Sequence, residues 1–92
     1  MDKALTKKRH QNGTAYKNLT KAIRQEKIDI DLLCIYVDMT PVQFKSKRYC
    51  ERHLSAEEAF RITMFINNNR LFQKEPYTMR WLFTKVPTWT KK

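Results

Sequence analysis

The chain has 92 residues, which is enough for one domain and too few for two. A hydrophobic fraction of 41% can supply a modest core, and one glycine with three prolines is too few for the turns of an all-β sandwich or barrel. The 19 Lys and Arg outnumber the 9 Asp and Glu, so the net charge of +10 favours a polyanionic partner, either nucleic acid or an anionic membrane.

The positive charge is concentrated at the two ends of the chain. Residues 1–12 hold four basic residues against one acidic residue, residues 70–92 hold six against one, and the middle holds nine against seven. We predict a flexible basic arm over residues 1–13, a folded domain over 14–69 and a basic aromatic C-terminal extension over 70–92. No stretch approaches the roughly 18 apolar residues of a membrane span. We expect no membrane partner and a cytoplasmic protein with reduced cysteines.

Two helices are predicted in the first part of the domain. Thr14 is the expected cap of a first helix at about residues 15–27, with apolar residues on one face and basic residues on another. The apolar set is Ala15, Leu19, Ala22 and Ile23, and the basic set is Lys17, Lys21 and Arg24. Asp29 is a good cap for a second, short helix. The buried face expected for that helix comprises Leu32, Leu33, Tyr36 and Val37.

Thr40 and Pro41 form a sharp signal for the start of a third helix. Threonine caps free N–H groups, and proline is tolerated at the first helical position because its missing N–H has no partner there. We predict this helix from Pro41 to about Tyr49, with Phe44 as its core anchor. The remaining residues are mostly polar and basic. One flank must therefore face water or a polyanion.

The fourth helix has the clearest local signal. Ser55 and Glu58 form an S-x-x-E capping box, and the helix is expected to end at the polar run 67–69. Its predicted buried face comprises Ala59, Ile62, Phe65 and Ile66. The tail has two interpretations: Pro76 opens a short fifth helix through Leu82, or residues 81–83 form a strand. Residues 84–92 are expected to be extended or disordered.

Two short helices joined by a three- or four-residue turn, with the second one basic, are typical of a helix-turn-helix. Residues 18–67 resemble the lambda-repressor-like, Cro-type regulators of phages and mobile elements. The resemblance rests on Leu33-Cys34, Val37-Asp38-Met39-Thr40, Phe44 and the segment 54–62, and residues 81–86 are similar to a tail of small phage regulators. Asp38 replaces the turn glycine of the family, and Arg48 stands where an apolar residue is usual. Aspartate tolerates the left-handed conformation that this turn requires.

The resemblance implies an all-α, lambda-repressor-like helix-turn-helix bundle of four to five short helices with a basic N-terminal arm and a C-terminal tail. It implies a transcriptional regulator, phage or mobile-element encoded, that reads the major groove of double-stranded DNA with the helix 41–49. The residues expected at base edges are Pro41, Val42, Gln43 and Ser46. Those expected at phosphates or guanine are Thr40, Lys45, Lys47, Arg48 and Arg52. In the arm, Lys7, Lys8 and Arg9 either lie in a minor groove or form a solvated tail. The C-terminal aromatics Trp81, Phe83 and Trp89 serve base stacking, a satellite core or a homodimer contact.

Motifs for catalysis are missing from the sequence. There is no Gly-rich phosphate loop, no nucleophile elbow and no paired-carboxylate signature, so we expect no enzyme, no small-molecule substrate and no cofactor. Cys50-x-x-His53 has a spacing that zinc can use, but Cys34 is a poor third ligand and we expect no metal. Two other functions stay open: a helix-turn-helix fold reused as a protein-binding inhibitor module, and an architectural or excision factor that bends DNA.

Overall fold

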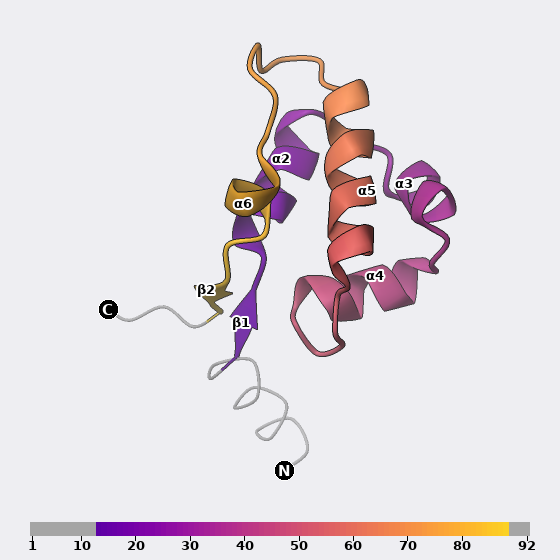
Figure 1. The fold of residues 1–92 in the computed structure, drawn as a ribbon, viewed down its shortest axis with the longest axis vertical. Coiled ribbons are helices and arrows are strands. Elements are labelled where there is room, and N and C mark those ends of the chain that lie inside the picture. The colour runs from indigo at the N-terminus through magenta and orange to yellow at the C-terminus, as the bar shows by residue number, and fades with distance from the viewer. Residues whose placement is uncertain (1–12, 89–92) are drawn as a thin grey trace.

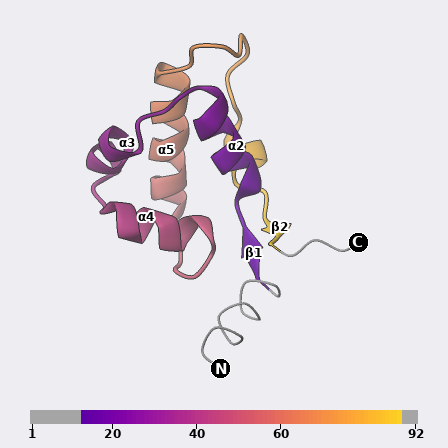
Figure 2. The ribbon, with the colours of Figure 1, turned by 180° about the vertical axis from the view of Figure 1, so that it is seen from behind.

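The computed structural model describes residues 13–88 and is mostly helical, as expected. Its elements, in chain order, are β1 (Thr14–Ala15), α2 (Lys17–Gln25), α3 (Ile30–Val37), α4 (Pro41–Arg48), α5 (Ala56–Asn68), α6 (Met79–Leu82) and β2 (Val86–Pro87). Helix α5 stands at the centre, with α2 and α6 on one side of it and α3 on the other, and α4 runs across the lower end of α5 from α3 toward α2 (Figures 1 and 2). No helix within residues 13–88 has both the length and the apolar character needed to cross a bilayer.

Three helices begin at the caps that the sequence predicts. The Asp29 carboxylate accepts hydrogen bonds from two backbone N–H groups at the start of α3. Thr40 and Gln43 form a capping box at the start of α4, with distances of 3.1 Å from Gln43 N to Thr40 Oγ1 and 2.9 Å from Thr40 N to Gln43 Oε1. Ser55 and Glu58 do the same at α5. These predictions succeed because a cap involves residues only two or three positions apart.

The predicted start of the first helix is wrong. Thr14 caps nothing, because it lies in β1, where it is opposite Pro87 in an antiparallel pair with β2. Helix α2 begins only at Lys17, after Tyr16, whose side chain makes no capping hydrogen bond. The cause is a contact between the two ends of the described chain, which no local pattern in the sequence reveals.

The core is formed by one face from each of the five helices. The apolar set predicted on the first helix, Ala15, Leu19, Ala22 and Ile23, is buried throughout. Phe44 is the buried residue of α4 and is 1% exposed. On α3 the prediction is only half right: Leu33 and Val37 are buried, but Leu32 and Tyr36 are 55% and 44% exposed. The α3 helix packs on α5 through one face: Tyr36 lies at the edge of this contact, with its ring 5.4 Å from that of Phe65 between centroids, and Leu32 remains at the surface.

The tail packs back on this core. The predicted fifth helix exists as α6, but Thr78 caps it in place of Pro76, with its Oγ1 accepting a hydrogen bond from Trp81 N. The alternative of a strand at residues 81–83 is wrong, and the strand of the tail lies at Val86–Pro87 instead. Leu82 is fully buried, and the ring of Phe83 packs edge-on against Tyr16 at a centroid distance of 5.2 Å. The tail therefore contributes to the same core as residues 14–69.

A buried carboxylate fixes the loop between α5 and α6. Glu26 has no exposed surface. Its Oε1 accepts hydrogen bonds from Leu71 N at 2.6 Å and Phe72 N at 2.7 Å, and its Oε2 accepts from Gln73 N at 3.1 Å and Tyr77 Oη at 2.7 Å. Burial by itself would raise the pKa of Glu26, but these donors outweigh it and lower the pKa to about 2. The loop is thereby fastened to the end of α2, at the end of the molecule opposite α4 (Figure 1).

Candidate nucleic-acid interface

The connection between α3 and α4 contains three residues, 38–40. Asp38 adopts the left-handed conformation, with φ 58° and ψ 53°, as predicted for the residue that replaces the turn glycine. Asp38 N donates to Ile35 O and Met39 N donates to Cys34 O, which closes the end of α3. The chain then turns directly into the capped start of α4.

The first turn of α4 points away from the core. Thr40, Pro41, Val42 and Gln43 are exposed, and Val42 is 76% exposed. Lys45 is exposed in the second turn and Ser46 is half-buried. Of the residues expected at base edges, the structure therefore leaves three accessible on one surface and partly covers Ser46.

Lys47 is held within the fold. Its Nζ lies 2.7 Å from Glu58 Oε2, and its side chain is only 17% exposed. Burial acts to raise the pKa of Glu58, but hydrogen bonds from Lys47 and Ser55 N reverse this and lower it. Lys47 thus ties α4 to the start of α5, and any phosphate that it contacts must compete with Glu58.

Arg48 is half-buried between α4 and α2. Its Nη1 donates to Thr20 Oγ1 at 3.2 Å, and its guanidinium carbon lies 5.1 Å from the centroid of the Phe44 ring. Burial lowers the pKa of Arg48. Its Nε is buried and has no hydrogen-bond partner in the part of the chain that the structure describes. Arg48 thus covers the buried Phe44 ring while its charged end reaches Thr20.

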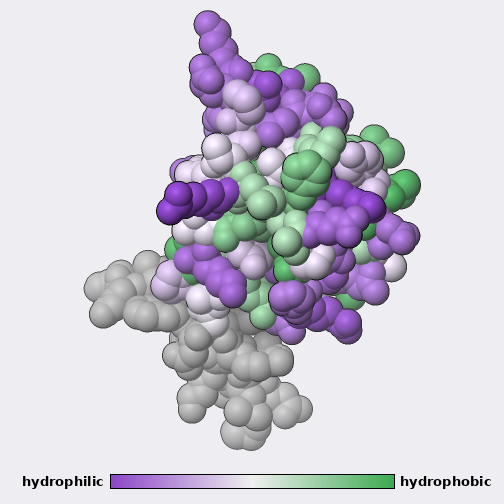
Figure 3. All heavy atoms as spheres, in the orientation of Figure 1, coloured by the Kyte–Doolittle hydropathy of each residue, from purple (hydrophilic) through white to green (hydrophobic). Residues whose placement is uncertain are grey.

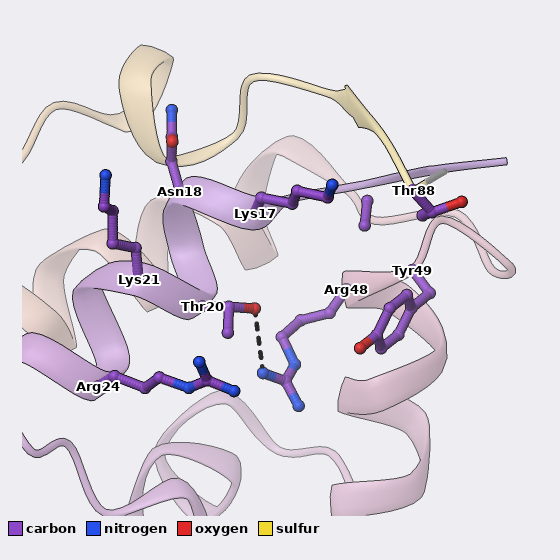
Figure 4. Close-up of a pocket in the computed structure, with 9 residues that line it drawn as sticks. Lys17, Asn18, Thr20, Lys21, Arg24, Arg48, Tyr49 and Thr88 are labelled. Atoms are coloured by element: carbon purple, nitrogen blue, oxygen red, sulfur yellow. Dashed lines mark hydrogen bonds between the residues drawn. The ribbon is translucent and has the colours of Figure 1, made fainter. Parts of the chain in front are cut away.

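A cationic groove lies beside Arg48, between α2 and the end of α4 (Figure 4). Its volume is about 500 Å³. Four basic residues line it, and no carboxylate of residues 13–88 does. The lining consists of Ala15, Lys17, Asn18, Thr20, Lys21, Arg24, Arg48, Tyr49 and Thr88. The sequence predicts that Lys17, Lys21 and Arg24 share one basic face of the first helix, but it does not indicate that this face belongs to the site.

The outer face of α3 has the opposite character. Leu32, Ile35 and Tyr36 are 55%, 75% and 44% exposed, and α3 contains no basic residue. The carboxylates of Asp29 and Asp31 lie at its N-terminus and Asp38 follows its C-terminus, all three residues being exposed. The surface is therefore acidic and apolar at α3, and basic where α2 meets the end of α4.

The remaining predicted site residues are spread more widely. Arg52 is exposed in the loop between α4 and α5. Lys7, Lys8 and Arg9 of the arm, and Trp89 of the tail, lie outside the described residues. Trp81 is 39% exposed and stacks on Tyr77 at a centroid distance of 5.7 Å.

Hydrophobic side chains also gather at the centre of the face in Figure 3, over α5 and α6. The exposed apolar residues on these two helices include Phe60, Met64 and Met79.

No group of three or more His, Cys, Asp or Glu within residues 13–88 is arranged to hold a metal ion. Cys34 is buried, Cys50 is half-buried, and both are free thiols. His53 is exposed. Comparison with protein-family models, with curated proteins and with solved structures finds no match to this chain.

Proposed function

We propose that the chain is a DNA-binding protein of the helix-turn-helix type that inserts α4 into the major groove of double-stranded DNA. The observation that carries the proposal is the exposure of Pro41, Val42 and Gln43 on the first turn of a helix that Phe44 anchors from behind. An α-helix fits the width of the major groove, and its N-terminal residues are those that meet base edges. The left-handed turn at Asp38 supports this placement of α4.

The exposed side chains of α4 suit different contacts. Val42 offers an apolar surface to a thymine methyl group, and Lys45 reaches phosphate or guanine. Gln43 uses its Oε1 to accept from Thr40 N, which leaves its Nε2 as a free donor in the same rotamer. The oxygen of a side-chain amide has two lone pairs, so Oε1 retains a second acceptor site, and Gln43 can offer an acceptor and a donor to adenine while the capping box stays closed.

The function is binding without catalysis, as a transcriptional regulator of a phage or mobile element. A regulator of this type acts as a dimer on a two-part site. The apolar side chains of Phe60, Met64 and Met79 on α5 and α6 offer a surface for a second copy. Sedimentation velocity at micromolar concentration tests whether the protein forms a dimer. If the protein stays a monomer both alone and on a duplex with a two-part site, the dimer proposal is wrong.

The main test compares two apolar residues of nearly equal exposure on neighbouring helices. Val42 is 76% exposed on α4 and Ile35 is 75% exposed on α3. Duplexes selected from a random library give the best site, and titrations with that site give affinities. Val42→Ala should lower affinity for the selected site about tenfold, which corresponds to about 1.4 kcal/mol. Ile35→Ala should leave it unchanged. Selection that enriches no sequence, with equal affinities for both variants, would reject the proposal.

A second function is favoured by the face of α3. Its exposed Leu32, Ile35 and Tyr36, flanked by carboxylates, resemble a protein-binding surface more than a nucleic-acid surface. For a protein-binding module, Ile35→Ala would abolish capture of one stoichiometric protein partner and Val42→Ala would not. DNA binding is therefore sensitive to Val42→Ala and not to Ile35→Ala, whereas protein binding is sensitive to Ile35→Ala and not to Val42→Ala.

A further inference from the structure

We propose that the groove between α2 and the end of α4 binds a phosphodiester group of the DNA backbone, and that the duplex therefore lies across α4 toward α2 and away from α3. The groove is the hollow lined by Lys17, Lys21, Arg24 and Arg48. This inference rests on the proposed function, because it takes the duplex as the partner. It adds a phosphate site that the pattern of the third helix did not indicate.

The first argument is uncompensated charge. No ion pair joins Lys17, Lys21 or Arg24 to any carboxylate within residues 13–88, whereas Lys47 and Arg61 each have an acidic partner. Figure 4 shows the Arg24 guanidinium pointing toward Arg48. Burial is the main cause of the lowered pKa of Arg48, and repulsion from Arg24 adds to it. An anion between the two guanidinium groups would relieve this repulsion.

The second argument is the supply of donors. A guanidinium carries five N–H groups in a planar fork that matches phosphate. Arg48 uses Nη1 for Thr20 Oγ1, and its Nη2 makes no hydrogen bond within residues 13–88; the unpartnered Nε is buried and is not counted among the donors open to the groove. Contacts with the Phe44 ring and Thr20 hold the guanidinium in place. Little side-chain entropy would be lost when it binds an anion.

The third argument is the condition of the alternative site. A helix N-terminus ordinarily attracts phosphate through its free N–H groups and its dipole. At α3, the Asp29 carboxylate already accepts from Asp31 N and Leu32 N, and the carboxylate of Asp31 adds a second negative charge. A phosphate would be repelled there. The groove, by contrast, is lined by positive charges, and Arg48 joins it to the last turn of α4.

The experiment measures duplex affinity as a function of salt for two double variants with the same change in net charge. Lys17→Gln/Lys21→Gln removes two charges from the groove. Lys27→Gln/Lys74→Gln removes two exposed charges at the opposite end of the molecule, one just after the end of α2 and one in the α5–α6 loop. Each lost phosphate contact reduces the slope of log affinity against log salt by about 0.9.

We expect the groove variant to lose about 0.9 from this slope, because one phosphodiester contact is lost, and roughly tenfold in affinity on every duplex, specific or not. The control variant should change the slope by much less. Lys17→Arg/Lys21→Arg should retain the wild-type slope because the charges remain. Equal slopes for the groove and control variants, with Val42→Ala still weakening the selected site, would overturn the groove proposal and leave the DNA-binding function standing. Absence of duplex binding by the wild type would reject the function itself.

A separate arm tests a free phosphate as the source of the anion. Inorganic phosphate is titrated into the protein while the NMR signals of Thr20 NH and the Arg48 side chain are followed. Weak shifts that saturate only at tens of millimolar, together with the slope loss above, support a backbone site. Saturation below a millimolar, with no slope difference between the two double variants, would show that the groove serves a free phosphate compound and would overturn the proposal.

Discussion

Helices α3 and α4 have the same length of eight residues and follow one another in the chain, yet they have opposite roles. Helix α3 buries Leu33, Cys34 and Val37, contains no basic residue and is flanked by carboxylates. Helix α4 buries Phe44 and carries three basic residues in its second half. The comparison shows that one helix mainly packs into the core and the other mainly exposes side chains to solvent. Helix α3 belongs to the core, whereas α4 is held by the Phe44 anchor and by polar ties at Lys47 and Arg48 in its last turn, so that its first turn stays free.

The largest expected effect comes from breaking the anchor of α4. Phe44→Ala should reduce the free energy of unfolding by about 3 to 5 kcal/mol, because it removes a fully buried aromatic ring and leaves a cavity. Ile35→Ala on α3 is the matched control and should change it by less than about 0.5 kcal/mol, since Ile35 is 75% exposed. Urea unfolding followed by circular dichroism measures both. Equal effects would contradict the contrast between the helices.

The next effect concerns the end of the molecule opposite α4. Glu26→Gln should lower the free energy of unfolding by about 2 to 3 kcal/mol. The carboxylate that accepts hydrogen bonds from the α5–α6 loop is replaced by an amide with fewer acceptor sites. Glu75→Gln is the control, because Glu75 is exposed. Duplex binding through α4 should be retained by the folded fraction of Glu26→Gln.

Glu26 also makes the stability depend on pH. Its folded pKa of about 2 lies below the unfolded value of roughly 4.3. The unfolded chain therefore binds the proton more readily, so the contribution of Glu26 is complete above about pH 4.3 and is lost as the pH falls toward 2. Urea midpoints at pH 7, 4 and 2.5 should fall more steeply for the wild type than for Glu26→Gln. Parallel decreases would show that other groups cause the acid sensitivity.

A smaller effect is expected from the tie between α4 and α5. Lys47→Met should cost about 1 to 2 kcal/mol, because it leaves the partly buried Glu58 carboxylate without its cation. Arg61→Met, which breaks the exposed pair with Glu57, should cost less than about 0.5 kcal/mol. Hydrogen exchange should show that the backbone amides of α4 lose protection and that those of α3 do not. A uniform change over the whole chain would contradict a local role of this tie.

The smallest effect is expected at Asp38, whose negative charge lies between the acidic α3 and the basic α4. Asp38→Gly should stabilise the fold by about 0.5 to 1 kcal/mol, because glycine adopts the left-handed conformation at φ 58° without a Cβ penalty. Asp38→Asn removes the same charge and retains a side chain that tolerates this conformation. Both variants should bind duplex DNA slightly more tightly at low salt. Tighter binding by the glycine variant alone would assign the gain to the backbone and not to charge.

The sequence predicts the local features of this fold well. The caps at Asp29, Thr40 and Ser55 are correct, as are the buried anchor Phe44 and the left-handed turn at Asp38. Each depends on residues close together in the chain or on a single apolar residue among polar ones. The errors occur where distant segments meet, as at Thr14 in β1 and at the exposed Leu32 and Tyr36 of α3.

The candidate site is predictable only in part, for the same reason. The sequence identifies the cationic character of the helix after Thr40, but it treats Lys47 and Arg48 as equivalent to Lys45. In the structure Lys47 pairs with Glu58, and Arg48 lies between Phe44 and Thr20, while Lys45 remains exposed. The partners come from α5 and α2, 11 and 28 positions away. Charge and periodicity along one helix contain no information about such partners.

By itself, the amino-acid sequence determined where most helices begin, which residue anchors α4 and how strongly basic the whole chain is, because these properties follow from neighbouring residues and composition. Only the tertiary structure decided which cations are paired and which gather around one hollow. The groove unites residues of α2 with Arg48 and Thr88, which are brought together when α2, the end of α4 and the returning tail pack around the same core. Packing of distant segments, and not local propensity, therefore separates the basic side of the molecule from the acidic side.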